Sequence, residues 1–182
     1  MEILDIVDEH GQPTGQTADR ETAHALGLPH RTAHVWLVRR HAGRIQVLLQ
    51  KRCQQKDAFP GCYDISSAGH IPAGVDYIPS ALRELREELG VTLREDDLVF
   101  CADRLVTHDG EFHGKPFHNR QYSRVFCAWC PLEESAFTLQ KEEIEQVRWM
   151  DLEECISAVE ENRFPNCIST EELFFVREKT RG

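Results

Sequence analysis

Hydrophobic and polar positions along the chain follow two different periods. Short apolar runs bounded by Gly, Pro and polar residues predict β-strands, whereas apolar residues repeated every three or four positions predict helices. Two apolar runs separated by His41-Ala42-Gly43 indicate a hairpin. The expected strands are 2–7, 33–38, 45–50, 64–67, 98–107, 121–129 and 146–150, and the expected helices are 18–26, 78–89, 152–161 and 170–179.

The predicted strands and helices mix without a regular alternation, which is typical of an α/β fold with a mixed sheet. The polar residues between the strands at 98–107 and 121–129 predict a loop over 109–120. A chain of 182 residues, 41% of them hydrophobic, can bury one sizeable core, so we expect a single domain.

Charge and hydropathy limit the classes of partner and location. A formal net charge of -10 argues against nucleic acid and anionic membranes as partners, although local basic residues or a bound cation would still admit a small anionic substrate. No apolar run reaches transmembrane length, and the N-terminus is acidic where a secretory signal would be basic. The seven scattered cysteines suit reduced thiols. We therefore expect a cytoplasmic protein.

The helix expected at 78–89 carries two stripes. Glu84, Glu87 and Glu88 stand at positions i, i+3 and i+4, so their carboxylates share one edge of the helix. That edge borders the apolar stripe instead of opposing it. The apolar stripe consists of Ile78, Ala81, Leu82, Leu85 and Leu89.

This acidic edge has two interpretations. It is either a solvated face, as an Arg83–Glu87 pair at i, i+4 would suggest, or a site that gathers carboxylates around a cation. Repulsion between Glu84 and Glu88 costs about 0.2–0.5 kcal/mol, and acidic residues near the helix C-terminus cost roughly 0.3–1 kcal/mol. A divalent cation would remove both costs. The glycine-bearing loop 68–74 favours the cation site, because it lets the backbone approach a ligand.

The spacing from Gly69 to the sequence RELREELGV at 83–91 resembles the Nudix box of diphosphate hydrolases. That motif is Gly, five residues, Glu, seven residues, then Arg-Glu-aliphatic-X-Glu-Glu-X-Gly-aliphatic. The resemblance implies an α/β/α sandwich with a mixed sheet and an N-terminal β-hairpin extension. We expect one Nudix domain over 1–182, with the extension at 1–30 and the box at 69–91.

The resemblance also implies the roles of the box residues. Mg²⁺ or Mn²⁺ would be held by Glu84, Glu87 and Glu88, and Arg83 would orient these glutamates. Water would then attack a diphosphate linked to an organic group. One position departs from the motif, because Val75 replaces the first box glutamate and can neither bind metal nor hydrogen-bond the loop.

The segments HRTAHVWLV, LLQKR, KDAFPG and DISSAGHI are similar to the branch of the family related to isopentenyl-diphosphate isomerase. In the isomerases a cysteine stands where this chain has Ala68, and a glutamate stands near Gln121. Neither replacement moves a proton usefully at neutral pH, so isomerase chemistry lacks its acid and base.

Three histidines of this chain are similar in position to those that hold the isomerase metal: His24, His30 and His70. The carboxylates that complete the isomerase site are not evident at Asn119 and Gln121. The sequence therefore leaves a second metal site open.

The resemblance further places diphosphate contacts at Arg52 and Lys56, beside the loop that begins at Gly69. The general base would be Glu88 or a member of the acidic segment before Arg148, and we select Glu143 because related hydrolases often draw a ligand or base from this region. The other candidates in that segment are Glu142 and Glu145.

The sequence suggests three alternative functions. The first is a Mg²⁺- or Mn²⁺-dependent hydrolase of a nucleoside or other organic diphosphate, with Glu87, Glu88, Arg83 and Glu143 as its catalytic residues. The alternatives are an isopentenyl-diphosphate isomerase and a protein that binds a nucleotide or diphosphate without turnover. The expected partner is a small-molecule diphosphate, and the sequence leaves a homodimer open.

Overall fold

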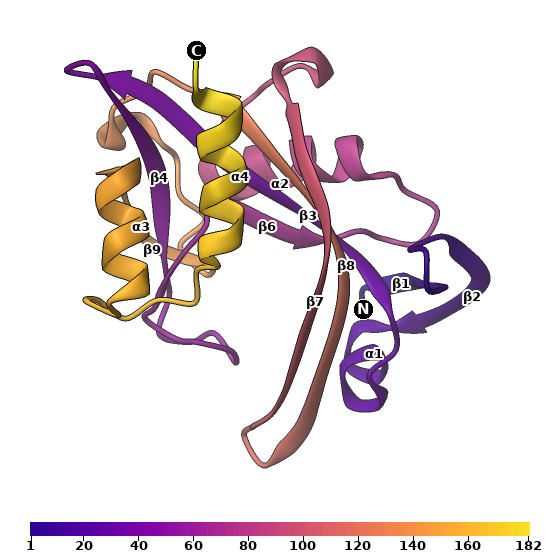
Figure 1. Cartoon of the computed structure of the whole chain (residues 1–182). Coiled ribbons are helices and arrows are strands. Elements are labelled where there is room, and N and C mark those ends of the chain that lie inside the picture. The colour runs from indigo at the N-terminus through magenta and orange to yellow at the C-terminus, as the bar shows by residue number, and fades with distance from the viewer.

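The centre of the molecule is a seven-stranded mixed sheet, in a computed structural model that describes all residues 1–182 (Figure 1). The strand order is β5-β4-β3-β8-β7, with β6 added to β3 and β9 added to β4. β3 and β8 are parallel, and the other pairs are antiparallel. The strands are β3 (His30–His41), β4 (Arg44–Arg52), β5 (Tyr63–Asp64), β6 (Ser67–His70), β7 (Val99–Phe112), β8 (Lys115–Trp129) and β9 (Ile144–Asp151).

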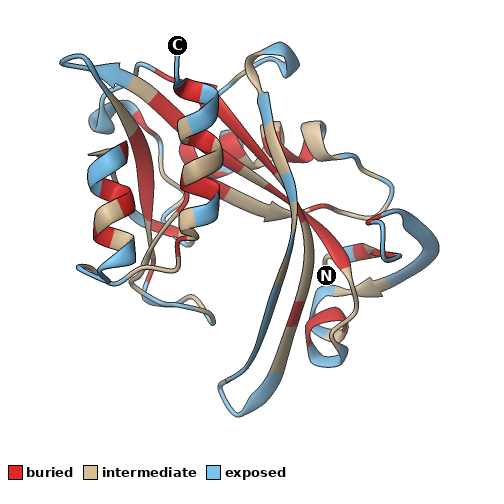
Figure 2. Cartoon of the chain, in the orientation of Figure 1, coloured by how far each residue is buried: buried red, intermediate tan, exposed pale blue.

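Helices cover both faces of this sheet. One core cluster lies between the sheet and α2 (Tyr77–Leu89), and a second lies between the sheet and the pair α3 (Leu152–Glu160) and α4 (Thr170–Thr180). Figure 2 shows the buried residues along the middle of the sheet and on the inner sides of the helices. The predicted α/β/α sandwich with a mixed sheet is confirmed. None of the helices has the length and apolar character needed to cross a membrane.

The N-terminal extension forms its own two-stranded antiparallel sheet, which confirms the predicted hairpin. It consists of β1 (Ile3–Val7) and β2 (Pro13–Asp19), followed by α1 (Arg20–Leu26). The Asp19 side chain caps α1, and Gly27 ends it with a φ of 66°. β3 then begins at His30 and runs through the core, so the extension lies at one end of the sheet (Figure 1).

The expectation of a loop over 109–120 is wrong. β7 and β8 continue their pairing to Phe112↔Lys115 and form a long hairpin that extends away from the body (Figure 1). His113 and Gly114 make the two-residue turn with φ values of 51° and 73°, which is the geometry that hairpin turns prefer. Cross-strand pairs hold the polar strands together, as Asp109 with His118 shows at 2.8 Å.

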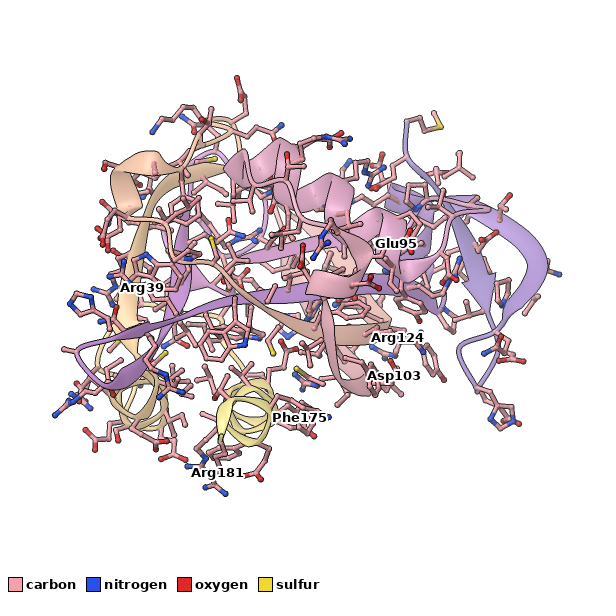
Figure 3. All side chains as sticks on the ribbon, turned by 90° about the horizontal axis from the view of Figure 1, so that it is seen from above. Arg39, Glu95, Asp103, Arg124, Phe175 and Arg181 are labelled. Atoms are coloured by element: carbon pink, nitrogen blue, oxygen red, sulfur yellow. The ribbon has the colours of Figure 1, made fainter.

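Arg124 and Asp103 form another cross-strand pair of this hairpin, and their side chains lie side by side in Figure 3. Two bonds of 2.7 and 2.8 Å join the guanidinium to the carboxylate. Two short 3-10 helices, η1 (Glu95–Asp97) and η2 (Glu134–Ala136), lie in connecting segments.

A buried carboxylate joins α4 to the sheet. The Glu172 side chain, 2% exposed, accepts bonds from His34 Nδ1 at 2.8 Å, from Trp36 Nε1 at 3.0 Å and from Arg104 at 3.0 Å. Burial alone would raise the pKa of Glu172, but these three donors outweigh it and lower the pKa to about 2. The network therefore holds an ionised glutamate inside the second core cluster.

Candidate active site

The helix α2 positions the acidic edge that the sequence predicts. The Asp76 side chain accepts the Tyr77 N–H at 2.7 Å at its start, and Gly90 ends it with a φ of 69°. Its apolar stripe packs into the first core cluster, with Ala81, Leu85 and Leu89 buried and Ile78 and Leu82 half-buried. Packing of this stripe fixes the rotation of α2 and hence the direction of its acidic edge.

The three glutamates of this edge differ in exposure. Glu87 is exposed, Glu84 is half-buried, and Glu88 is only 7% exposed. Glu88 Oε2 accepts a hydrogen bond of 2.8 Å from Ser67 Oγ, on the strand that lies under the helix. Burial, together with repulsion from Glu84, raises the pKa of Glu88 to about 8. The charge of Lys56 and the bond from Ser67 lower this pKa in part, but they do not outweigh the effect of burial.

Glu84 lies directly against Gly69. A Cβ atom at Gly69 would come within 2.5 Å of the Glu84 Cγ and Cδ atoms, so only glycine leaves room for this side chain. Arg83 bonds to the Glu84 carboxylate, and its Nε lies 4.0 Å from Glu87 Oε2. Burial raises the pKa of Glu84, and bonding to Arg83 opposes this change. The Arg83 side chain therefore lies against two of the three glutamates.

A groove of about 630 Å³ opens beside this edge. Its walls come from α2, from the loop after β6 and from the N-terminal residues. Hard carboxylate oxygens at one end of a groove suit Mg²⁺, which keeps several waters and bridges to phosphates. The donors present therefore fit the cation that the motif implies. The lining residues are Met1, Glu2, Ile3, Pro72, Ala73, Arg83, Glu84 and Glu87.

Of the predicted basic contacts, Lys56 lies with the predicted base Glu143 close enough to Glu88 to influence it. Lys56 forms an ion pair with Glu143, and both side chains act on the pKa of Glu88 through their charges. Arg52 donates to Ala58 O at 3.0 Å and to Asp64 Oδ2 at 3.2 Å. Both basic side chains thus have partners within the chain, and an incoming phosphate would compete with these partners.

Three histidines meet on the side of β6 opposite to α2. The ligand atoms of His24, His30 and His70 all lie within 4.8 Å of one another. His30 Nδ1 lies 2.8 Å from Leu28 O, while the Nε2 atoms of His24 and His30 are buried without a hydrogen-bond partner. Burial lowers the pKa values of all three, that of His24 to about 4. The cluster is therefore neutral at pH 7 and can offer nitrogen lone pairs to a metal.

Sequence reasoning missed two residues of this site. Ser67 could have been found, since it stands two positions before Gly69 and therefore faces α2 by strand alternation. Glu2 gave no signal, because only the folded N-terminal strand brings it to the groove, 3.8 Å from His70 Nδ1. At position 75 the valine packs against the first core cluster and adds no carboxylate.

Comparison with known proteins identifies the family of this chain. The sequence profile of the NUDIX domain matches residues 28–167. The chain is 43% identical over 156 residues to Nudix hydrolase 3 of Arabidopsis thaliana, a match that covers 84% of this chain and 20% of that protein. It is 34% identical over 143 residues to an uncharacterised Nudix hydrolase of Clostridium acetobutylicum, covering 79% of this chain and 66% of the relative. The chain thus spans about a fifth and about two thirds of these relatives.

Solved structures share the fold. A Deinococcus radiodurans protein, DR0079, superposes with a TM-score of 0.68 at 18% identity over 97% of this chain and 98% of that one. A Caenorhabditis elegans Ap4A hydrolase in a binary complex superposes with a TM-score of 0.54 at 22% identity over 82% of this chain and 96% of that one. From the matched domain, its relatives and the shared fold, the chain belongs to the Nudix hydrolase superfamily.

Proposed function

We propose that this chain hydrolyses a diphosphate linkage in a small organic molecule, with Mg²⁺ or Mn²⁺ as its cofactor. The observation that carries the proposal is the convergence of Glu84 and Glu88 on β6, where Gly69 makes room for one carboxylate and Ser67 bonds the other. Two acidic groups held this close repel each other, and a divalent cation relieves that repulsion.

We assign the site residues separate roles in binding the cation, orienting its ligands and binding the substrate. Glu84, Glu87 and Glu88 hold the cation, which when bound neutralises the diphosphate and lowers the pKa of a coordinated water. Arg83 keeps Glu84 in place through their ion pair. Arg52 and Lys56 bind the anionic oxygens once they exchange Asp64 and Glu143 for phosphate.

Glu143 is the proposed general base. Its carboxylate is half-exposed and pairs with Lys56, so release of Lys56 to the substrate would free Glu143 to accept a proton from water. Glu88, whose pKa is raised to about 8, would hold the cation only in its ionised form. Lys56 thereby links the binding of the substrate's diphosphate to the activation of Glu143 as a base.

A double-bond isomerase on an isoprenoid diphosphate is the second candidate. The cluster of His24, His30 and His70, with its unpartnered nitrogens, is a candidate site for a second divalent cation. Ala68 packs against the second core cluster, and the Gln121 amide lies 3.5 Å from His70. Neither side chain can transfer the proton that isomerisation requires, so hydrolysis is the better-supported reaction.

The test is incubation with Mg²⁺ and a panel of nucleoside diphosphates, nucleoside triphosphates, dinucleotide sugars and isoprenoid diphosphates, followed by phosphorus NMR. Hydrolysis predicts new phosphate resonances from at least one compound, and their loss in Glu87→Gln. Saturable binding without new resonances would identify a binding protein instead. Deuterium incorporation at the allylic carbon of isopentenyl diphosphate would support the isomerase.

A further inference from the structure

The loop 71–76 between β6 and α2 lacks the carboxylate that the family motif places at position 75. It is nevertheless tied to the N-terminal strand β1. Ala73 N–H donates to Ile3 O at 2.8 Å, and Leu4 forms a β-bridge with Pro72. The first half of this loop therefore pairs with the N-terminal extension as a short strand does.

A buried ion pair holds the second half of the loop. Asp5 Oδ2 accepts the Gly74 N–H at 2.9 Å and a bond from Arg31 at 3.0 Å. The same Arg31 guanidinium donates to Val75 O at 2.9 Å and lies over the Tyr77 ring, 5.5 Å from its centroid. The side chains of Asp5 and Arg31 are 13% and 8% exposed, so the bond between them has little competition from water.

From these contacts we propose that Asp5 and Arg31 form a positioning pair, which fixes the loop 71–76 in place of the glutamate missing at position 75. The inference rests on the proposed hydrolase function and extends it to residues outside the box. The pair bonds the two residues that immediately precede Asp76, the cap of α2. The pair thereby fixes where α2 begins relative to Gly69 on β6. The start of α2 in turn determines how the Glu84 side chain packs against Gly69.

A purely structural role accounts less well for this arrangement. A buried ion pair often adds no net stability compared with apolar residues of the same volume. Here each charge bonds a backbone group of the loop as well as its partner, Gly74 N–H for Asp5 and Val75 O for Arg31. The bonds restrict the loop in the same place where the motif would supply a carboxylate.

The test uses Asp5→Asn, which keeps the shape of the side chain and removes its charge. Loss of a charge-assisted bond should weaken Mg²⁺ binding, measured by calorimetry, by about tenfold or more, and should lower kcat more than it raises KM. Adding Val75→Glu should restore most of the Mg²⁺ affinity, because it returns the carboxylate that the family motif places at this position. Adding Val75→Gln, which has the same size without the charge, should restore little.

Thr14→Val is the matched control. It removes the bond of 2.8 Å from Thr14 Oγ1 to Ile6 O inside the same hairpin without touching the loop, so Mg²⁺ affinity should stay within twofold of wild type. If Asp5→Asn does not fold, Arg31→Met replaces it, since methionine has no donor for the Asp5 carboxylate or for Val75 O. Wild-type Mg²⁺ affinity and kcat in the folded variant would overturn the proposal.

The proposal would also be overturned if Thr14→Val lost as much Mg²⁺ affinity as Asp5→Asn, or if Val75→Glu and Val75→Gln restored that affinity equally. Either outcome would mean that the Asp5–Arg31 pair contributes only to the stability of the fold. The calorimetric measurement does not require turnover. If wild type hydrolyses no compound of the panel, the proposed function fails, while the Mg²⁺ affinities of these variants still decide the role of the pair.

Discussion

Substitution of Gly69 by alanine should separate the stability of the fold from the function of the site. The added Cβ would lie 2.5 Å from the Glu84 Cγ and Cδ atoms and 2.7 Å from Oε1. Carbon atoms normally approach to about 3.5–4.0 Å, so the carboxylate must move by about 1 Å. The obstacle is the end of a flexible side chain, which can turn toward the groove at little cost.

The expected effects differ in size. A displacement of about 1 Å at a catalytic group costs about 100-fold in rate, equivalent to about 2.7 kcal/mol of transition-state stabilisation. The free energy of unfolding should change by less than about 1 kcal/mol, because alanine is favoured over glycine in a strand and Gly69 has no positive φ to lose. Gly69→Ala should therefore melt close to wild type and lose most of its Mg²⁺-dependent turnover.

The assay combines thermal melting, Mg²⁺ calorimetry and kcat/KM for the best substrate of the panel. A Glu84→Gln variant supplies the control, because adding Gly69→Ala to it should cause little further loss if the methyl group acts through Glu84. Full activity of Gly69→Ala would refute the contact between this glycine and a functional carboxylate. The contact would also be refuted if the losses of kcat/KM from Gly69→Ala and Glu84→Gln were additive in the double variant.

Three further predictions follow from burial and charge. Glu87→Gln should lower Mg²⁺-dependent turnover by about 100-fold or more with an unchanged melting temperature, because Glu87 is exposed and its role is that of a ligand. Because burial raises the pKa of Glu88 to about 8, Mg²⁺ binding at pH 7 should release up to about one proton, measured by calorimetry in buffers of different ionisation enthalpy; no release would contradict this. Glu172→Gln should destabilise the fold by about 3–5 kcal/mol in denaturant titrations. Because the pKa of Glu172 is lowered to about 2, the stability that its ionised form contributes is present above pH 4.5 and is lost as the pH falls toward 2. His34 has the opposite dependence, because Glu172 raises its pKa against the effect of burial. The stability that protonated His34 contributes is present below pH 6.5 and is lost at higher pH.

Periodicity and spacing were sufficient to predict the helix α2 and its acidic edge. The apolar stripe sets which side of α2 meets the sheet, so the positions of Glu84, Glu87 and Glu88 follow from local geometry. The same reasoning failed at 109–120, where polar composition outweighed the turn signal. His113-Gly114 is a two-residue hairpin turn, and cross-strand pairs stabilise the mostly polar strands on either side of it.

Contacts between segments far apart in the sequence could not be predicted. Nothing local indicates that Asp5 reaches Gly74, that Glu2 lines the groove, or that Lys56 pairs with Glu143. These contacts depend on how the N-terminal hairpin and the connecting segments dock on the finished sheet. The departure at Val75 was visible in the sequence, but its compensation by Asp5 and Arg31 appears only in three dimensions.

Anomalous diffraction from crystals soaked with Mn²⁺ and a methylene-bridged diphosphate would locate the metal relative to the acidic edge of α2. We expect a manganese peak within about 2.5 Å of carboxylate oxygens from Glu84, Glu87 and Glu88, with the diphosphate oxygens on its other side. A peak confined to the histidine cluster, or a diphosphate bound with no metal at the acidic edge, would contradict it.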